Sequence, residues 1–181
     1  MSTVQWIVSH EAEIRLGVFV FLLAALRGLE WRYGLRSGNG GSSTRQLANA
    51  GLLVLDTAVL RFAFPLLAVA LAVALEGSGV GVFAVTPWPA WLEVPLAVLL
   101  LDLGVYWQHR LMHRVPILWR MHRVHHTDLA FDVTTGVRFH PFEIALSMGW
   151  KLALVVLLGA APLAVVLFEV LLSATSLFTH A

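Results

Sequence analysis

The sequence predicts an all-α protein: a polytopic membrane helical bundle with histidine motifs on helix extensions at the cytoplasmic side. Three observations predict this class. Of 181 residues, 59% are hydrophobic and only 13% are charged, and the mean hydropathy is +0.80. This balance is typical of proteins with several membrane spans and far from that of soluble domains. Long apolar runs alternate with short polar segments, and six of the eight histidines lie between Asp102 and Glu143.

The length suits one compact domain. We expect residues 1–181 to form a single membrane-embedded domain, with N-terminal spans in 1–90 and a histidine-motif region in 91–181. Cysteine is absent, which excludes disulfides and a thiolate metal site. The net charge of +1 gives no indication of a nucleic-acid partner. The N-terminus lacks the pattern of a cleavable signal peptide, so we expect the first span to direct insertion.

Five apolar segments are candidate spans. The first is short and has Arg15 and Arg27 near its ends, where long side chains can reach the membrane interface. The last two are separated by the sequence GAAP, and either both cross or they form a hairpin that does not fully cross. The five segments are 14–29, 47–75, 91–108, 144–158 and 163–178.

Arginine placement predicts the orientation. The loop 31–45, which includes the polar stretch SGNGGSST, contains three arginines and no acid, and the turn 77–89 contains no Lys or Arg. The histidine-motif segment carries five arginines: Arg110, Arg114, Arg120, Arg123 and Arg138. By the positive-inside rule, we expect the loop 31–45 and the histidine motifs in the cytoplasm, with the N-terminus and the turn outside. Five spans would return His180 to the level of the motifs.

Two histidine motifs indicate a metal site. His109 and His113 form HxxxH, and HxxHH follows at His122, His125 and His126. On a helix, residues three and four apart share one face, so each motif presents a stripe of imidazoles, the commonest protein ligand for zinc, copper and iron. A structural role explains a lone histidine well and fits His10, while for His140 both interpretations stay open. It does not explain five histidines within eighteen residues.

The type of metal chemistry follows from what surrounds the motifs. HExxH is absent, because Arg110 and Arg114 follow the histidines of the first motif, and the paired Glu-x-x-His of carboxylate di-iron bundles is absent too. An all-imidazole cluster remains. Zinc has no redox chemistry, so a zinc site would imply hydrolysis, whereas an oxidation would require a redox metal.

Several further side chains are candidates for orienting the imidazoles or for additional ligands. Asp102 and Tyr106 each lie seven residues before a histidine of the first motif, on nearly the same helical face. Asp102 has the alternative of pairing with Arg61. Glu143, three residues after His140, is either a charge at a helix start or an outer carboxylate of the site.

The strings HRLMH, LWRMHRVHH and RFHPFE resemble the fatty acid hydroxylase and sterol desaturase superfamily of membrane enzymes. The resemblance is specific from Leu101 to Glu143 and looser through FTHA at the end. It implies a non-haem di-iron centre that uses dioxygen to hydroxylate or desaturate a fatty acyl or sterol-like lipid. An electron donor of the reductase, cytochrome or ferredoxin type would supply the electrons. The implied iron ligands are His109, His113, His122, His125, His126 and His180.

The superfamily has a further HxxHH downstream of a segment resembling SLFTHA, whereas this sequence stops at Ala181. We therefore expect a fragment or an incomplete centre, which on its own is inactive and binds fewer than two irons per chain.

Two other classes compete. A membrane haem protein with paired histidine ligands needs well-separated single histidines inside spans. A histidine-rich metal transporter or sensor needs ionisable ligands mid-span along a path. The histidines cluster at span ends instead.

Finally, Lys151 and Glu169 each lie nine residues from Ala160, in the turn between the last two apolar segments. If these helices pack antiparallel, the two charges share one depth. Because a lone charge near the bilayer centre costs roughly 2.5–3.5 kcal/mol on insertion scales, we expect them to form a buried ion pair.

Overall fold

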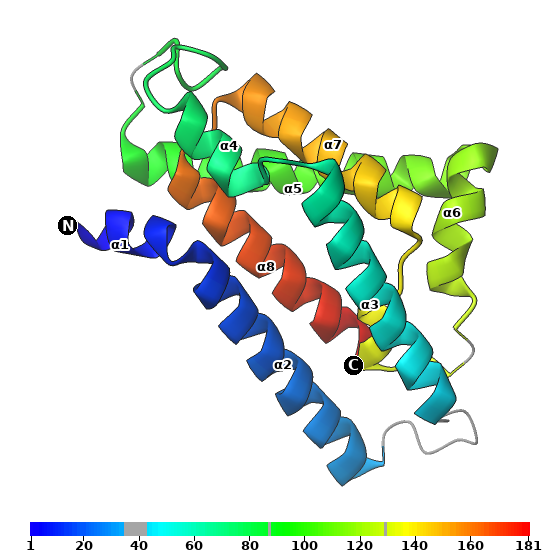
Figure 1. Ribbon diagram of the computed structural model, residues 1–181. Helices are drawn as coiled ribbons and strands as arrows, with labels where there is room; N and C mark the ends of the chain where they lie inside the picture. Colours follow the sequence, from blue (N-terminus) through cyan, green and yellow to red (C-terminus); the bar gives the residue numbers. More distant parts are fainter. Residues whose placement is uncertain (35–42, 87, 129) are drawn as a thin grey trace.

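The computed structural model describes residues 1–34, 43–86, 88–128 and 130–181. These residues form helices joined by short connections and include no strand, which confirms the predicted all-α class (Figure 1). The elements are α1 (Thr3–Ser9), α2 (Glu11–Tyr33), α3 (Ser43–Ala63), α4 (Ala68–Leu75), α5 (Ala90–Arg114), α6 (Pro116–His126), the 3-10 helix η1 (Val133–Val137), α7 (Pro141–Leu158) and α8 (Pro162–His180).

Four helical segments within the described residues are long and apolar enough to cross a membrane: Ser43–Leu75, Ala90–Arg114, Pro141–Leu158 and Pro162–His180. Helix α2 covers the predicted first span, 14–29, but is not among the four. Its length suffices, at 23 residues. It differs because Arg15, Arg27 and Glu30 are spread along it, and all three charges are paired with other side chains of the protein.

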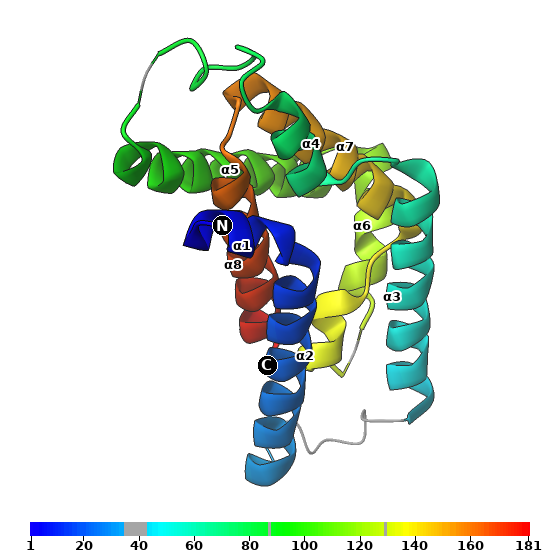
Figure 2. The same ribbon diagram turned by 60° about the vertical axis from the view of Figure 1, so that its left-hand side comes forward.

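The predicted second span, 47–75, is not one continuous helix. Helix α3 ends at Ala63 and α4 begins at Ala68, displaced from the axis of α3 (Figures 1 and 2). The break surrounds Pro65, whose ring removes a backbone donor and clashes with the preceding helical turn. Residues 35–42 of the predicted polar loop 31–45 lie outside the described part of the chain.

Helix α8 is the centre of the bundle. It packs against α2, α4, α5 and η1, and Ala164, Val165 and Val166 are fully buried in consecutive positions. A helix that is apolar on all sides belongs in an interior rather than at a surface. Ala97 and Leu101 of α5 are equally buried against it, so these two helices hold the core around which the others are arranged.

The end of the bundle opposite the histidine motifs is closed by a backbone contact. The N–H groups of Val82 and Phe83 donate to the carbonyls of Leu157 and Leu158, at 3.0 and 2.8 Å. Gly81 and Gly159, both at positive φ, touch there: a Cβ on Gly81 would lie 2.1 Å from Gly159 N. The loop after α4 thus lies beside the α7–α8 turn.

The expected ion pair between Lys151 and Glu169 is confirmed, with Lys151 Nζ 2.6 Å from Glu169 Oε1. The structure adds a partner that the sequence did not reveal. Arg15 of α2 reaches Glu169 Oε2 at 2.5 Å and also pairs with Glu11 at 2.9 Å. The guanidinium of Arg15 thus turns toward α8, and its reach to the membrane interface stays a prediction.

Candidate metal centre

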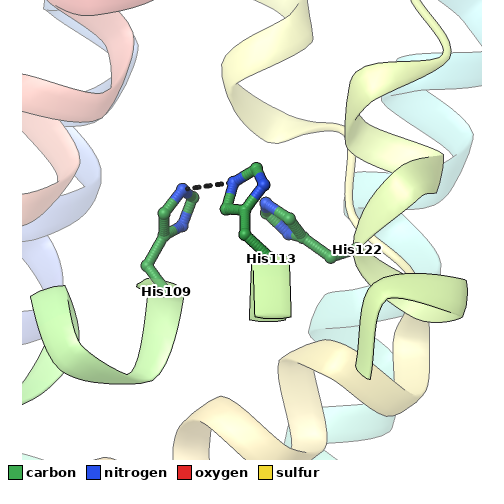
Figure 3. A group of neighbouring side chains, drawn as sticks. All are labelled: His109, His113 and His122. Atoms are coloured by element: carbon green, nitrogen blue, oxygen red, sulfur yellow. Dashed lines mark hydrogen bonds between the residues drawn. The ribbon is translucent and has the colours of Figure 1, made fainter. Parts of the chain in front are cut away.

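Two helix ends and one sharp turn bring the histidines together. His109 and His113 lie on the last turns of α5, the second motif lies on α6, and His180 ends α8. Val115 precedes Pro116, and the residue before a proline is pushed out of the helical region, so α5 stops and α6 starts in a new direction (Figure 1). The two imidazole stripes consequently face each other, as His109, His113 and His122 show in Figure 3.

The six histidines expected as ligands form three pairs that meet through Nε2. His109 and His113 approach to 3.2 Å, His122 and His126 to 3.1 Å, and His125 and His180 to 3.1 Å. The first two pairs are four residues apart on one helix, whereas the third joins residues 55 positions apart. Helix α8 thus delivers its histidine to the level of the motifs.

Oxygen acceptors fix the orientation of three of these rings. Nδ1 of His122 lies 2.6 Å from Glu143 Oε1, Nδ1 of His125 lies 3.3 Å from the carbonyl of Arg138, and Nδ1 of His180 lies 2.6 Å from the carbonyl of Ser176. Since carbonyl and carboxylate oxygens only accept, each Nδ1 carries the hydrogen. Each neutral ring then presents the Nε2 lone pair to the cluster, which is the arrangement of metal-ligating histidines.

This arrangement fits a cation. Nε2 of His125 and Nε2 of His180 direct lone pairs at each other, which is unfavourable unless a positive charge lies between them. Two imidazole nitrogens bound at right angles to one ion, each about 2.1 Å from it, are about 3 Å apart, close to the three separations observed. His109, His113 and His122 also offer ligand atoms that all lie within 4.8 Å of one another.

Burial favours the neutral forms of His125 and His126 on α6. It lowers the pKa of His125 to about 4, an effect that positive charge on His180, His126 and His122 would reinforce. The pKa of His126 is lowered too, first by burial and then by His122 and His113. An imidazole binds metal only when unprotonated, so both rings are ready to ligate across the neutral range.

Of the other candidate residues, all of which lie in the described part of the chain, only Glu143 contacts a histidine of the cluster. Glu143 contacts His122, as described above. His140 caps α7 by accepting from the N–H of Phe142 at 3.2 Å, which is a structural role. Asp102 is exposed and, among the described residues, has no ion pair with Arg61 and no contact with a histidine. Tyr106 accepts from Arg110 instead, at 3.1 Å.

Asp102 and Tyr106 lie too far along α5 to reach the histidines of the first motif. Seven residues along a helix return to nearly the same face but advance about 10 Å. An aspartate or tyrosine two turns away therefore does not reach the imidazole that shares its face. Glu143 succeeds because it comes from another helix, α7, which packs against both α5 and α6.

Residues 94–181, which contain all six of these histidines, match the family model described as fatty acid hydroxylase. This segment belongs to the fatty acid hydroxylase family. We refer to residues 94–181 as the hydroxylase segment.

Similar proteins within the superfamily modify different lipids, as their names state. The chain is 40% identical over 53 residues to alkylglycerol monooxygenase of Xenopus tropicalis, covering 29% of this chain and 11% of that protein. It is 35% identical over 81 residues to an ornithine lipid hydroxylase of Rhizobium tropici, covering 45% and 24%. It is 31% identical over 67 residues to a Delta(7)-sterol 5(6)-desaturase of Aspergillus fumigatus, covering 36% and 18%. The matches thus span a quarter or less of these relatives, and no solved structure matches the chain.

Charged side chains of α2 and α3 form a network with acids of the hydroxylase segment, and no sequence motif predicted it. Arg45 of α3 pairs with Asp128 at 2.7 Å and also with Asp132. Arg27 of α2 reaches Asp132 at 3.4 Å, and Glu30 accepts from the N–H of Val133 at 2.8 Å. The available signal was the polarity of Glu30 and Asn49 within otherwise apolar stretches.

Asn49, which is fully buried, links this network to the metal centre. Its side chain donates to Asp128 at 3.1 Å and accepts from Arg138 at 2.8 Å. The carbonyl of Arg138 in turn accepts from His125. The pKa of Asp128 would be raised by burial, but hydrogen bonds from Thr135 and Asn49 and the charge of Arg45 lower it overall. The network therefore carries stable charge at neutral pH.

A cavity of about 680 Å³ adjoins the histidine cluster. His109, His125 and His180 line it at the cluster end, and most of its exposed wall consists of apolar atoms, although polar residues outnumber apolar ones in the lining. Its size is that of a small-molecule site. The hydroxylase segment thus joins a candidate metal centre to a largely apolar chamber.

Proposed function

We propose that this protein is a membrane-bound non-haem di-iron oxidoreductase that uses dioxygen to hydroxylate or desaturate a lipid. The observation that carries the proposal is that six histidines from three helices meet in pairs through Nε2, and that three of them line one end of a largely apolar cavity. Membership of the hydroxylase segment in its family supports the reaction class. The named relatives act on an alkylglycerol, an ornithine lipid and a sterol, which supports a fatty acyl or sterol-like substrate.

His109, His113, His122, His125, His126 and His180 would hold the iron. Iron bound there supplies the activation of dioxygen that attack on an unactivated C–H bond needs. The protein orients the ligands: Glu143, Arg138 and Ser176 accept from Nδ1 of three imidazoles and so hold them in the tautomer that presents Nε2. The apolar walls bind the hydrocarbon portion of the substrate beside His109, His125 and His180 and exclude water from it.

The membrane orientation belongs to the same proposal. The arginine-rich histidine-motif segment lies at the end of the bundle where α2 ends and α3 begins, because Arg45 and Arg27 pair with its acids. We infer that this end faces the cytoplasm. An electron donor of the reductase, cytochrome or ferredoxin type would dock there, while the lipid enters from the membrane.

Metal analysis of the purified protein, together with its optical spectrum, tests the proposal. We expect iron to be retained without a Soret band. A Soret band would indicate haem, and zinc or a mixed metal content would indicate a transporter, a sensor or a hydrolase. With iron present, the complete enzyme, which includes the last histidine motif, is supplied with dioxygen, a reductant and a mixed lipid extract, and the lipids are analysed by mass spectrometry. Loss of two hydrogens indicates desaturation, and gain of one oxygen indicates hydroxylation.

A further inference from the structure

The cavity extends away from the histidines along two antiparallel helices. Glu143, Ser147 and Lys151 follow at intervals of four residues on α7, so they share one face, and all three line the cavity. Ser176 and Ser173 line it on α8, between His180 and Glu169. Eight helical residues advance about 12 Å. The cavity therefore runs from the metal centre to Lys151 over roughly that distance.

Lys151 ends this cavity with unused hydrogen-bonding capacity. An ammonium group has three N–H donors, and among the described residues its side chain makes one hydrogen bond, to Glu169 Oε1 at 2.6 Å. The side chain of Lys151 keeps 16% of its surface exposed, whereas that of Glu169 keeps 3%. The lysine rather than the carboxylate is thus the member of the pair that faces the cavity.

The charges at this end of the cavity are balanced. Lys151 pairs with Glu169, Glu169 pairs with Arg15, and Arg15 pairs with Glu11, which gives two cations and two anions. An anionic group entering the cavity would leave a net charge buried beside apolar walls, which is costly. A neutral oxygen acceptor would use the free N–H donors of Lys151 and leave the balance unchanged.

We propose that Lys151 is a specificity-determining residue that hydrogen-bonds a neutral oxygen of the substrate, such as a hydroxyl, on the order of 12 Å from the carbon that is oxidised. The substrate class is then a lipid with such an oxygen at the far end of an otherwise apolar body. This inference rests on the proposed function for the identity of the reacting end. The binding contact itself does not depend on it.

The test compares two probes, a long-chain primary alcohol and the alkane of the same length, on the full chain in detergent, with binding measured by native mass spectrometry. The wild type should prefer the alcohol. Lys151→Met should lose about tenfold to hundredfold in alcohol affinity, the range for a hydrogen bond to a charged group, while alkane affinity stays. Unchanged alkane binding also shows that the variant is folded. Should Lys151→Met fail to fold, Lys151→Met combined with Glu169→Gln removes both charges and is tested in the same way.

Arg15→Met is the matched control, because it removes the other cation from Glu169 without removing a cavity-lining donor. It should keep the preference for the alcohol. The inference is overturned if the wild type shows no preference, if neither probe binds, if Lys151→Met keeps the preference, or if Arg15→Met loses it equally. Failure of the proposed function has a different signature: the Lys151-dependent preference persists although the protein holds no iron or oxidises no lipid.

Discussion

A histidine can bind a metal through either ring nitrogen, and the acceptor of the other nitrogen decides which one faces the site. Here the acceptors are a carboxylate from α7, a carbonyl after η1 and a carbonyl within α8. Spacing along the sequence identified the imidazoles but not these acceptors. A carbonyl carries no sequence signal, and Glu143 was only one of several acids in reach of the motifs.

Glu143 is the acceptor that a mutation can remove. Glu143→Gln takes the charge away from His122 and should lower iron affinity about 10- to 100-fold, as substitutions of residues that orient ligands do. The iron content that remains after dialysis against a chelator measures this loss of affinity. Glu76→Gln, an exposed acid in the loop after α4, is the control and should match the wild type.

His125 contacts three other predicted ligands, His122, His126 and His180, and joins α6 to α8. In the complete enzyme, which includes the last histidine motif, His125→Ala should abolish lipid oxidation and reduce bound iron, because it removes an imidazole and leaves the lone pair of His180 without a shared ion. Turnover and iron content are measured on the same preparation. Full activity in this variant would refute the ligand assignment.

Asp56 on α3 is a buried acid to which neither the fold nor the candidate site assigns a role. It is 4% exposed, and within the described residues neither carboxylate oxygen has a hydrogen-bond partner. An unsatisfied buried polar group costs roughly 1–3 kcal/mol, and a charge costs more. Asp56→Leu, which replaces the carboxylate with an apolar side chain, should therefore raise the free energy of unfolding by roughly 1–3 kcal/mol, measured by denaturant unfolding in detergent. A loss of stability would show that the carboxylate has a partner.

At the scale of elements, apolarity predicted where helices lie but not where they break or what they pair with. The segment 47–75 is apolar throughout, so only Pro65 marks the interruption between α3 and α4. The region 77–89 was predicted as a turn, yet its backbone contact with the α7–α8 turn depends on a glycine pair 78 positions apart, which no local pattern reveals.

That glycine pair gives a matched comparison. Gly81→Ala combines a strained positive φ with a clash against the backbone of Gly159, whereas Gly77→Ala, also at positive φ, meets nothing within 4 Å. We expect Gly77→Ala to cost about 1–2 kcal/mol, the usual penalty for this conformation, and Gly81→Ala to cost clearly more. Thermal unfolding of both variants measures the difference, and equal losses would mean that the contact does not constrain the loop.

The network around Asp132 predicts an acid-dependent stability. Burial would raise the pKa of Asp132, but hydrogen bonds from Thr134 and Arg45 outweigh it and hold the pKa below its ordinary value of 3.8. A group whose pKa is depressed by folding stabilises the protein above its unfolded value and loses that contribution as pH falls through the folded value. The stability advantage of wild type over Asp132→Asn should therefore be constant near neutrality and shrink below about pH 4. Asp102→Asn, at an exposed acid, should show no such advantage; an equal one would contradict the prediction.

At the scale of the whole molecule, helix α2 lies outside the hydroxylase segment but forms ion pairs with it near both ends of the helix. Near its start, Arg15 pairs with Glu169 of α8, and near its end, Arg27 pairs with Asp132. The antiparallel arrangement of α7 and α8 could be predicted from sequence, because their charges are equidistant from one turn. The place of α2 could not be, since nothing in the sequence relates Arg15 to a glutamate 154 positions later.

Because Arg15 also pairs with Glu169, a double-mutant cycle on Lys151 and Glu169 should not be symmetric. Glu169→Gln leaves Lys151 without its anion and Arg15 with only Glu11, so it should cost about 3–5 kcal/mol, as breaking a buried pair does. Lys151→Met leaves Glu169 paired with Arg15 at 2.5 Å and should cost less. The double variant should recover part of the loss of Glu169→Gln, because Lys151 is no longer stranded. Denaturant unfolding of the two single variants and the double variant gives the coupling. Strictly additive losses would mean that Lys151 and Glu169 do not interact, and equal single losses would mean that Arg15 does not share the carboxylate.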